Sequence, residues 1–165
     1  MPSVSIITPS HKPKYLDAAP ASVLAQTSSD WEWIVLLNAG AVWEPPNDER
    51  IKIVRIKKVS GVGEAKHRAA EHATGDYILE LDHDDTLHPN AVERVIQTFK
   101  KHKKASLVYS DAASIDENGT LIDTKYGDGY GWTYATYDGV LVPRTFAPTP
   151  HNISLIWFAP NHLRA

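Results

Sequence analysis

Short apolar runs alternate with stretches of helical spacing through the first two thirds of the chain. The runs are rich in Val and Ile and end at polar or turn-forming residues, which is typical of buried strands. We expect strands at residues 4–8, 33–37, 51–56, 77–81 and 107–109. Helices are predicted between them, over about residues 18–26 and 64–73 and from about residue 89 onward. This alternation predicts an α/β fold built from parallel βαβ units with right-handed crossovers.

The pattern weakens after residue 110. Residues 117–120 read Glu-Asn-Gly-Thr and predict a hairpin turn between short strands at 114–115 and 121–122. Residues 126–137 are rich in Gly and aromatic side chains without a period, so we expect a loop there, and residues 153–158 form a last apolar run. A length of 165 residues fits one domain of ordinary size, so we expect a single domain over the whole chain.

Composition excludes several classes of function. Seventeen Lys and Arg against twenty Asp and Glu give a net charge of −3, which argues against a generic nucleic-acid-binding protein. The absence of Cys removes disulfides, thiolate catalysis and Cys-type zinc sites. We find neither an apolar run near the roughly 20 residues that span a bilayer nor a basic leader typical of signal peptides. We therefore expect a cytoplasmic protein without a transmembrane segment.

Four lysines cluster at the predicted end of the third helix, at positions 100, 101, 103 and 104. Positive charge at a helix C-terminus complements the helix dipole, which is the simpler interpretation of the cluster. The alternative is a patch for anionic membranes, so a peripheral position at the inner face of the membrane stays open.

Polar residues follow three of the predicted strands, and in parallel sheets ligands bind at the carboxyl ends of the strands. These residues are Thr8-Pro9-Ser10, Asn38-Ala39-Gly40 and Asp82-His83-Asp84-Asp85. Three carboxylates within four residues repel one another and favour a nearby cation. Hard oxygen ligands with open positions suit Mg²⁺ or Mn²⁺ that bridges phosphate oxygens. The alternative is that these acids only cap the following helix.

The chain resembles glycosyltransferase family 2, the inverting nucleotide-sugar transferases of GT-A fold. Residues 4–11 resemble its opening strand and Thr-Pro-Thr-Tyr loop, and residues 22–27 resemble its Ser-Leu-x-x-Gln-Thr helix. Residues 61–67 are similar to its Gly-x-x-x-Ala-Arg-Asn segment. Residues 75–85 are close to its Gly-Asp-Tyr-Ile-x-Phe-Leu-Asp-x-Asp-Asp signature. The resemblance covers roughly residues 3–111 and implies a Rossmann-like, three-layer α/β/α sandwich with a mostly parallel central sheet.

The resemblance also implies roles for individual residues. Thr8, Pro9 and Ser10 would line the nucleotide base, and Asn38 stands near the position of an aspartate that usually contacts it. Lys66 would face the nucleotide, and His83 would also be a nucleotide-binding residue. Asp82 would reach the ribose or the metal, and Asp84 would be the principal ligand of Mn²⁺ or Mg²⁺. Asp85 would cap the next helix or support the site.

The implied activity is metal-dependent transfer of a sugar, of the hexosyltransferase type, with inversion. The donor would be a nucleoside-diphosphate sugar, with a UDP-sugar favoured, and the acceptor a saccharide or another hydroxyl. The family's general base lies well downstream of the resembled region, so we expect it beyond the chain and expect the C-terminal acceptor-binding part to be lacking. The catalytic base is therefore unassigned, and we expect donor binding without efficient transfer.

Two other functions stay open at this point. Asp82-His83-Asp84-Asp85-Thr86-Leu87 satisfies the Asp-x-Asp-x-Thr-Leu loop of haloacid-dehalogenase-like phosphatases, in which Asp82 would be the nucleophile. That family carries its motif on the first strand, whereas here three strands precede it. The other alternative is a non-catalytic module that binds nucleotide sugars or glycans.

Overall fold

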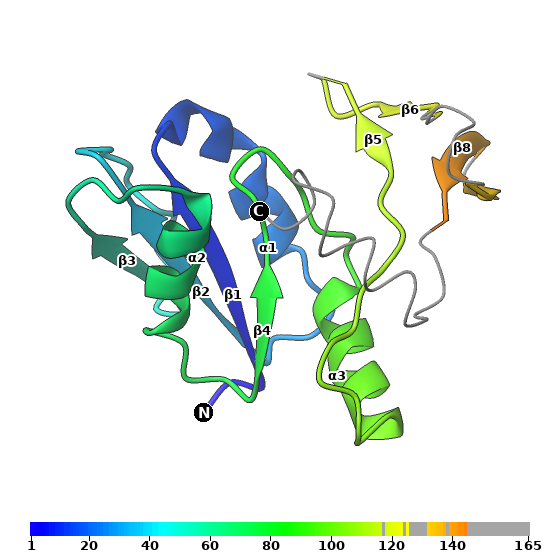
Figure 1. The fold of residues 1–165 in the computed structure, drawn as a ribbon, viewed down its shortest axis with the longest axis horizontal. Coiled ribbons are helices and arrows are strands. Elements are labelled where there is room, and N and C mark those ends of the chain that lie inside the picture. Colours follow the sequence, from blue (N-terminus) through cyan, green and yellow to red (C-terminus); the bar gives the residue numbers. More distant parts are fainter. Residues whose placement is uncertain (117, 124, 126–131, 138, 145–165) are drawn as a thin grey trace. The chain divides into compact units, whose positions relative to one another are not determined.

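The computed structural model describes residues 1–116, 118–123, 125, 132–137 and 139–144 (Figure 1). The chain forms two compact units, of which the first comprises residues 1–105 and the second begins at Ser106. The predicted strand at residues 107–109 is wrong, because this segment has no regular structure. The apolar run at residues 153–158 lies outside the described residues. The single-domain prediction stays a prediction.

A parallel sheet of four strands forms the centre of the first unit, in the order β3-β2-β1-β4. Its strands are β1 (Val4–Ser10), β2 (Trp31–Leu37), β3 (Ile51–Arg55) and β4 (Tyr77–Glu80). The register places Val4 beside Trp31 on one side and beside Tyr77 on the other. Because all pairings are parallel, the four carboxyl ends meet at one edge, as the sequence predicts.

Helices cover both faces of this sheet, which confirms the predicted α/β/α layers (Figure 1). The helices are the 3-10 helix η1 (Pro13–Asp17), α1 (Ala19–Leu24), α2 (Val62–Ala70) and α3 (Ala91–Lys101). Pro20 lies in the first turn of α1, where its missing N–H costs nothing. Alternate strand residues point to opposite faces, so each face has its own apolar core.

The larger core lies on the face covered by α1 and α3 and includes Trp33, Val23 and Val92, all fully buried. On the other face, Ala65 and Ala69 of α2 pack against Ile34 and its apolar neighbours. These small side chains let α2 approach the sheet closely. The helix begins and ends two to three residues earlier than predicted, since residues 71–72 form a turn.

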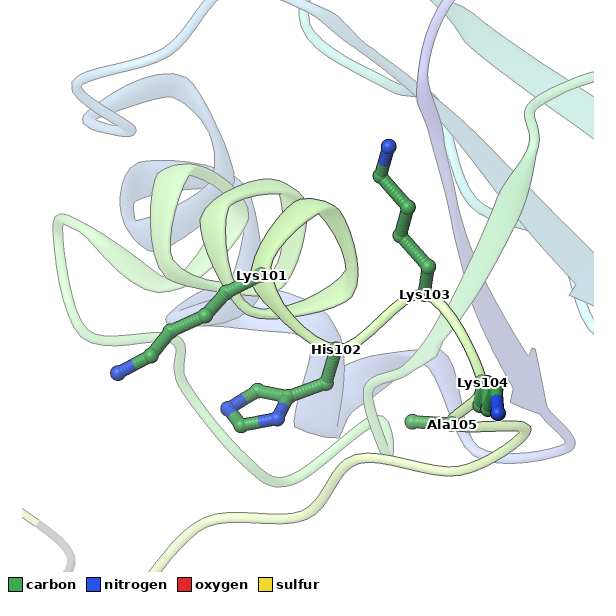
Figure 2. A pocket seen from close by; sticks show the side chains of 5 residues that line it. All are labelled: Lys101, His102, Lys103, Lys104 and Ala105. Atoms are coloured by element: carbon green, nitrogen blue, oxygen red, sulfur yellow. The ribbon is translucent and has the colours of Figure 1, made fainter.

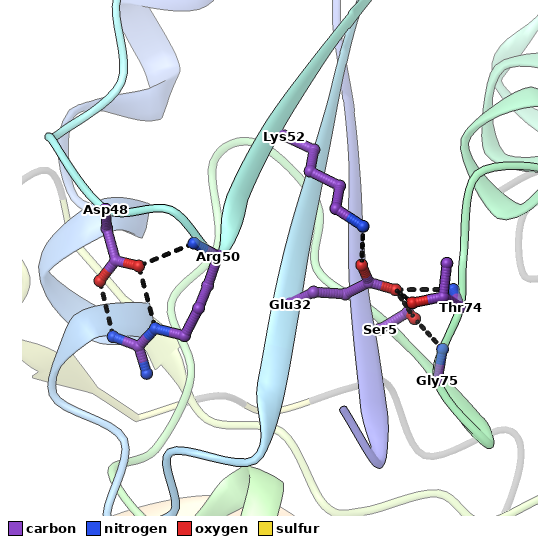
Figure 3. A network of polar contacts seen from close by, with 7 residues as sticks. All are labelled: Ser5, Glu32, Asp48, Arg50, Lys52, Thr74 and Gly75. Carbon is purple, nitrogen blue, oxygen red and sulfur yellow. Dashed lines mark hydrogen bonds and ion pairs between the residues drawn. The ribbon is translucent and has the colours of Figure 1, made fainter. Parts of the chain in front are cut away.

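A buried carboxylate joins three segments on the α2 side of the sheet (Figure 3). Glu32 is 3 % exposed and accepts hydrogen bonds from the Ser5 hydroxyl at 2.6 Å and from the Thr74 N–H at 2.6 Å. It also pairs with the ammonium of Lys52 on β3. Burial acts to raise the pKa of Glu32, but these donors together lower it to about 2. The network therefore ties the segment before β4 to strands β1, β2 and β3.

The described residues of the second unit form two short antiparallel hairpins. β5 (Ser114–Ile115) pairs with β6 (Leu121–Ile122), which confirms the predicted hairpin. β7 (Tyr134–Tyr137) pairs with β8 (Val140–Pro143). The predicted loop is therefore wrong for residues 134–137, and residues 126–131 lie outside the described residues. The missed signal is the Asp-Gly pair at positions 138–139, since such pairs favour tight hairpin turns and Gly139 has a φ of 80°.

Candidate functional site

The three polar strand ends predicted from the sequence lie at neighbouring positions of one sheet edge, which we call the rim. β1 is the central strand of the three, with β2 and β4 on either side. The backbone N–H of Asn38 donates to the carbonyl of Ser10 at 2.9 Å, and that of Leu81 donates to the carbonyl of Ile7 at 3.1 Å. The rim therefore brings residues 8–11, 38–40 and 81–85 together.

A cluster of aromatic rings lies where β1 and β4 end. The Ser10 hydroxyl and Nδ1 of His83 are hydrogen-bonded at 2.9 Å. The ring of His83 stacks on that of His11, with centroids 5.6 Å apart, and lies 5.3 Å from the ring of Tyr15 in η1. Ser10 is buried and His83 half-buried, whereas His11 and Tyr15 are exposed. The rim thus offers flat ring surface beside a hydroxyl, which suits a base or a sugar.

Lys66 brings a buried positive charge to the same end of β4. The residue is only 6 % exposed, and its ammonium lies 2.9 Å from Oδ1 of Asp82 and 3.0 Å from Oε2 of Glu80. Burial acts to lower the pKa of Lys66, but the two carboxylates raise it above its ordinary value. Lys66 therefore contacts the acidic segment directly, and its interaction with a nucleotide stays a prediction.

The three aspartates of residues 82–85 concentrate negative charge at the rim. The backbone N–H of Asp85 donates to the carbonyl of Asp82 at 3.1 Å, so the segment forms a tight turn. Loss of hydration raises the pKa of Asp85, and the Asp84 and Asp82 carboxylates raise it further. Lys66 acts in the opposite direction but does not offset their repulsion. The turn thus holds more carboxylate charge than Lys66 neutralises.

The donor set fits a hard divalent cation that retains other ligands. No group of three His, Asp or Glu side chains within the described residues is arranged to hold a metal ion. Asp84 is exposed and Asp82 is half-exposed, which leaves oxygen atoms accessible. Mg²⁺ and Mn²⁺ are commonly held by one or two carboxylates together with water and phosphate oxygens. The side chains of Asp82 and Asp84 suit that mode of binding and not a closed protein cage.

The other predicted rim residues differ in what they present to solvent. Thr8 is fully buried, and its hydroxyl accepts a hydrogen bond from Nε1 of Trp33 at 2.9 Å, so it supports the rim from beneath. Pro9 and Asn38 are half-buried. The side-chain oxygen of Asn38 accepts from the N–H of Val59 at 3.3 Å and orders the loop after β3.

Sequence reasoning missed Glu80, His11 and Tyr15 as parts of this site. Glu80 belongs to an apolar run, and only the α/β layering shows that its side chain faces Lys66 on α2. His11 adjoins the Thr-Pro-Ser segment, so its position was a usable signal. Tyr15 had no signal, because the turn of η1 that brings it to His83 depends on tertiary packing.

A concave surface lies at the end of α3 and not at the rim (Figure 2). It is an open hollow lined by Lys101, His102, Lys103, Lys104 and Ala105. The backbone N–H of Ala105 donates to the carbonyl of His102 at 2.8 Å, which closes the turn below the hollow. This is a basic surface without carboxylates, so its chemistry differs from that of the rim.

Solved structures share the fold of this chain. The structure of residues 1–349 of S. aureus TarS superposes with a TM-score of 0.54 at 16% identity, covering 73% of this chain and 43% of that one. The complex of the same protein with UDP-GlcNAc gives a TM-score of 0.53 at 18% identity, covering 79% and 36%. At this level of identity the similarity shows the fold alone, which confirms the predicted GT-A fold.

Sequence comparison identifies the family. Chondroitin synthase of Escherichia coli is 32% identical over 141 residues, covering 80% of this chain and 20% of that protein. Hyaluronan synthase of Pasteurella multocida is 32% identical over 141 residues, covering 80% and 14%. The chain thus spans a fifth or less of these relatives. The sequence profile of glycosyl transferase family 2 matches residues 5–148, which argues against the phosphatase alternative. The chain therefore belongs to glycosyl transferase family 2.

Proposed function

We propose that this chain binds the nucleotide-sugar donor of a metal-dependent, inverting glycosyltransferase. The observation that carries the proposal is the convergence of Ser10, His83, Lys66, Asp82 and Asp84 at the carboxyl ends of β1 and β4. This edge is where open parallel sheets bind their ligands. Family membership supports sugar transfer as the reaction.

Each part of the rim has a distinct task in this proposal. The rings of His11, Tyr15 and His83 offer stacking surface for the base or the ribose. Ser10 fixes the orientation of His83 through their hydrogen bond. Asp84, with Asp82, would hold Mn²⁺ or Mg²⁺. Such a cation would neutralise the negative charge that develops on the leaving nucleoside diphosphate.

A UDP-sugar is the first donor to test. The S. aureus TarS structures include complexes with UDP and with UDP-GlcNAc, which supports a uridine nucleotide. The names of the chondroitin and hyaluronan synthases support a saccharide as the acceptor. In an inverting reaction the acceptor hydroxyl attacks the face of the sugar opposite the leaving diphosphate.

Calorimetry with UDP in the presence and absence of Mn²⁺ tests the donor site. We expect Asp84→Asn to weaken Mn²⁺-dependent UDP binding by about tenfold or more, since interactions with charged groups are worth roughly 1.5–3 kcal/mol. Asp76→Asn is the matched control, because Asp76 is an exposed carboxylate at the opposite end of β4. Equal loss in both variants, or unchanged binding in Asp84→Asn, would contradict the proposal.

We also propose a cytoplasmic location with peripheral contact at the inner face of the membrane. Within the part of the chain that the structure describes, no helix has the length and apolar character needed to cross a bilayer. Support for the contact comes from Lys100, Lys101, Lys103 and Lys104, of which three line the hollow of Figure 2. Each lysine near an anionic surface contributes about 1 kcal/mol. Co-sedimentation with anionic but not neutral vesicles, lost when these lysines become Gln, is the expected result.

A further inference from the structure

Glu80 is the second carboxylate on Lys66, and the activity proposed above gives it no role. It occupies the last position of β4, and its side chain reaches Lys66 on the face of the sheet that α2 covers. In the family signature quoted above this position is Phe, so Glu80 is a departure of this chain. The side chain of Glu80 is 56% exposed and that of Lys66 only 7%. The exposed carboxylate is thus anchored on a buried ammonium.

Because Lys66 is buried, its charge depends on the carboxylates that pair with it. A buried charge lowers stability unless it is paired with an opposite charge. When one partner of a buried ion pair is removed, the other charge stays buried without compensation, which is strongly destabilising. Lys66 has two anionic partners, Glu80 at 3.0 Å and Asp82 at 2.9 Å. Asp82 also belongs to the carboxylates that suit a divalent cation. A cation bound at Asp82 would therefore compete with Lys66 for the same carboxylate.

We propose that Glu80 is a positioning residue that keeps Lys66 paired when Asp82 coordinates a divalent cation. With Glu80 present, the ammonium retains an anionic partner on β4, and Asp82 is released at little cost. Without Glu80, coordination by Asp82 would leave a buried ammonium with no carboxylate of its own. This inference rests on the proposed function, because it assumes the cation site at Asp82 and Asp84.

The test measures Mn²⁺ binding directly, through the loss of the electron paramagnetic resonance signal of free Mn²⁺ during titration. We expect Glu80→Gln to weaken Mn²⁺ binding by about threefold to tenfold, a modest effect because Glu80 is more than half exposed. UDP binding without metal should change much less. Asp76→Asn removes one negative charge just before β4, at the opposite end from Glu80, and it should leave Mn²⁺ affinity close to that of the parent.

A double-mutant cycle separates positioning through Lys66 from a direct electrostatic effect of Glu80. In the Lys66→Met background no ammonium needs a partner, so Glu80→Gln should have little further effect on Mn²⁺ affinity. An equal effect of Glu80→Gln in both backgrounds would show that the charge of Glu80 acts on the cation directly and not through Lys66. That result would overturn the inference. Thermal unfolding of each variant verifies that it is folded.

The outcomes distinguish this inference from the proposed function. A parent chain that binds no Mn²⁺ would refute the cation site itself, and the inference with it. A parent that binds Mn²⁺ and a folded Glu80→Gln variant that binds it equally well would refute the inference alone. A purely structural role for Glu80 would lower the melting temperature without changing Mn²⁺ affinity, and that result would also overturn it.

Discussion

At the residue scale, Gly75 shows how one backbone position supports the buried network around Glu32. Its N–H donates to the hydroxyl of Ser5 at 2.8 Å. A Cβ at this position would lie 2.8 Å from the backbone nitrogen of Ser5 and 2.9 Å from its hydroxyl oxygen. Any larger residue therefore forces the segment before β4 away from β1.

We expect Gly75→Ala to lower the free energy of unfolding by about 1–3 kcal/mol, the usual cost of overpacking. The measurement is chemical denaturation of the two proteins side by side. Gly63→Ala is the matched control, because Gly63 lies within α2 and a Cβ there meets nothing within 4 Å. That control should gain about 0.5–1 kcal/mol from reduced backbone entropy. Similar effects of both substitutions would show that Gly75 is not sterically required.

The sequence predicted which residues reach the rim better than it predicted their contacts. Asp82 and Ser10 follow apolar strands, so the strand pattern alone placed them there. Their partners depend on side-chain direction across layers. Lys66 lies on α2, and it contacts Asp82 because α2 packs against the sheet beside the end of β4. The hydroxyl of Thr8 points into the core and accepts a hydrogen bond from Trp33. Neither contact has a local signal.

At the element scale, the two central strands β1 and β2 were predictable because they are buried on both faces. The outer strands β3 and β4 alternate between half-buried and exposed positions but are still rich in apolar residues. Glu32 breaks the run of β2 at an inward position, where a lone carboxylate would be destabilising. The sequence shows no reason for it. The reason is tertiary, since its donors come from β1, from β3 and from the segment before β4.

The Glu32 network gives the sheet a specific pH dependence. The pKa of Glu32 falls from an ordinary value of 4.5 to about 2, despite burial, because its hydrogen bonds favour the carboxylate. A carboxyl with a lowered folded pKa stabilises the protein above its unfolded pKa and loses that contribution as the pH falls toward the folded pKa. A shift of this size corresponds to a contribution of about 3 kcal/mol at neutral pH.

We expect Glu32→Gln to unfold more easily than the parent at pH 7, with a difference that shrinks between about pH 5 and pH 2. Urea denaturation at several pH values measures it. Asp76→Asn, a change of an exposed carboxylate at the start of β4, should differ little from the parent. A difference for Glu32→Gln that stays constant down to pH 2 would contradict the low pKa.

At the scale of the whole molecule, the sequence predicted the layered first unit but not the boundary at Ser106. The alternation of strands and helices ends near this point, and β7 and β8 lie beyond it. Their pairing is antiparallel and local, so the βαβ pattern carries no information about them. The length of 165 residues favoured one domain, because it is ordinary for one domain and short for two, and length carries no information about where the chain divides into compact units.

We expect the first unit to fold alone, because its apolar cores do not draw on the second. Among the described residues, all members of both apolar cores lie between Val4 and Ile96. The rim residues from Ser10 to Asp85 also belong to the first unit. We therefore expect a chain of residues 1–105 to unfold cooperatively by circular dichroism and to bind UDP in the presence of Mn²⁺ about as tightly as the full chain. Asp84→Asn in this shorter chain should lose that binding, as in the longer one. A shorter chain that folds but binds no UDP would show that residues beyond Ser106 complete the donor site, whereas one that does not fold would show that the first unit needs them for its stability.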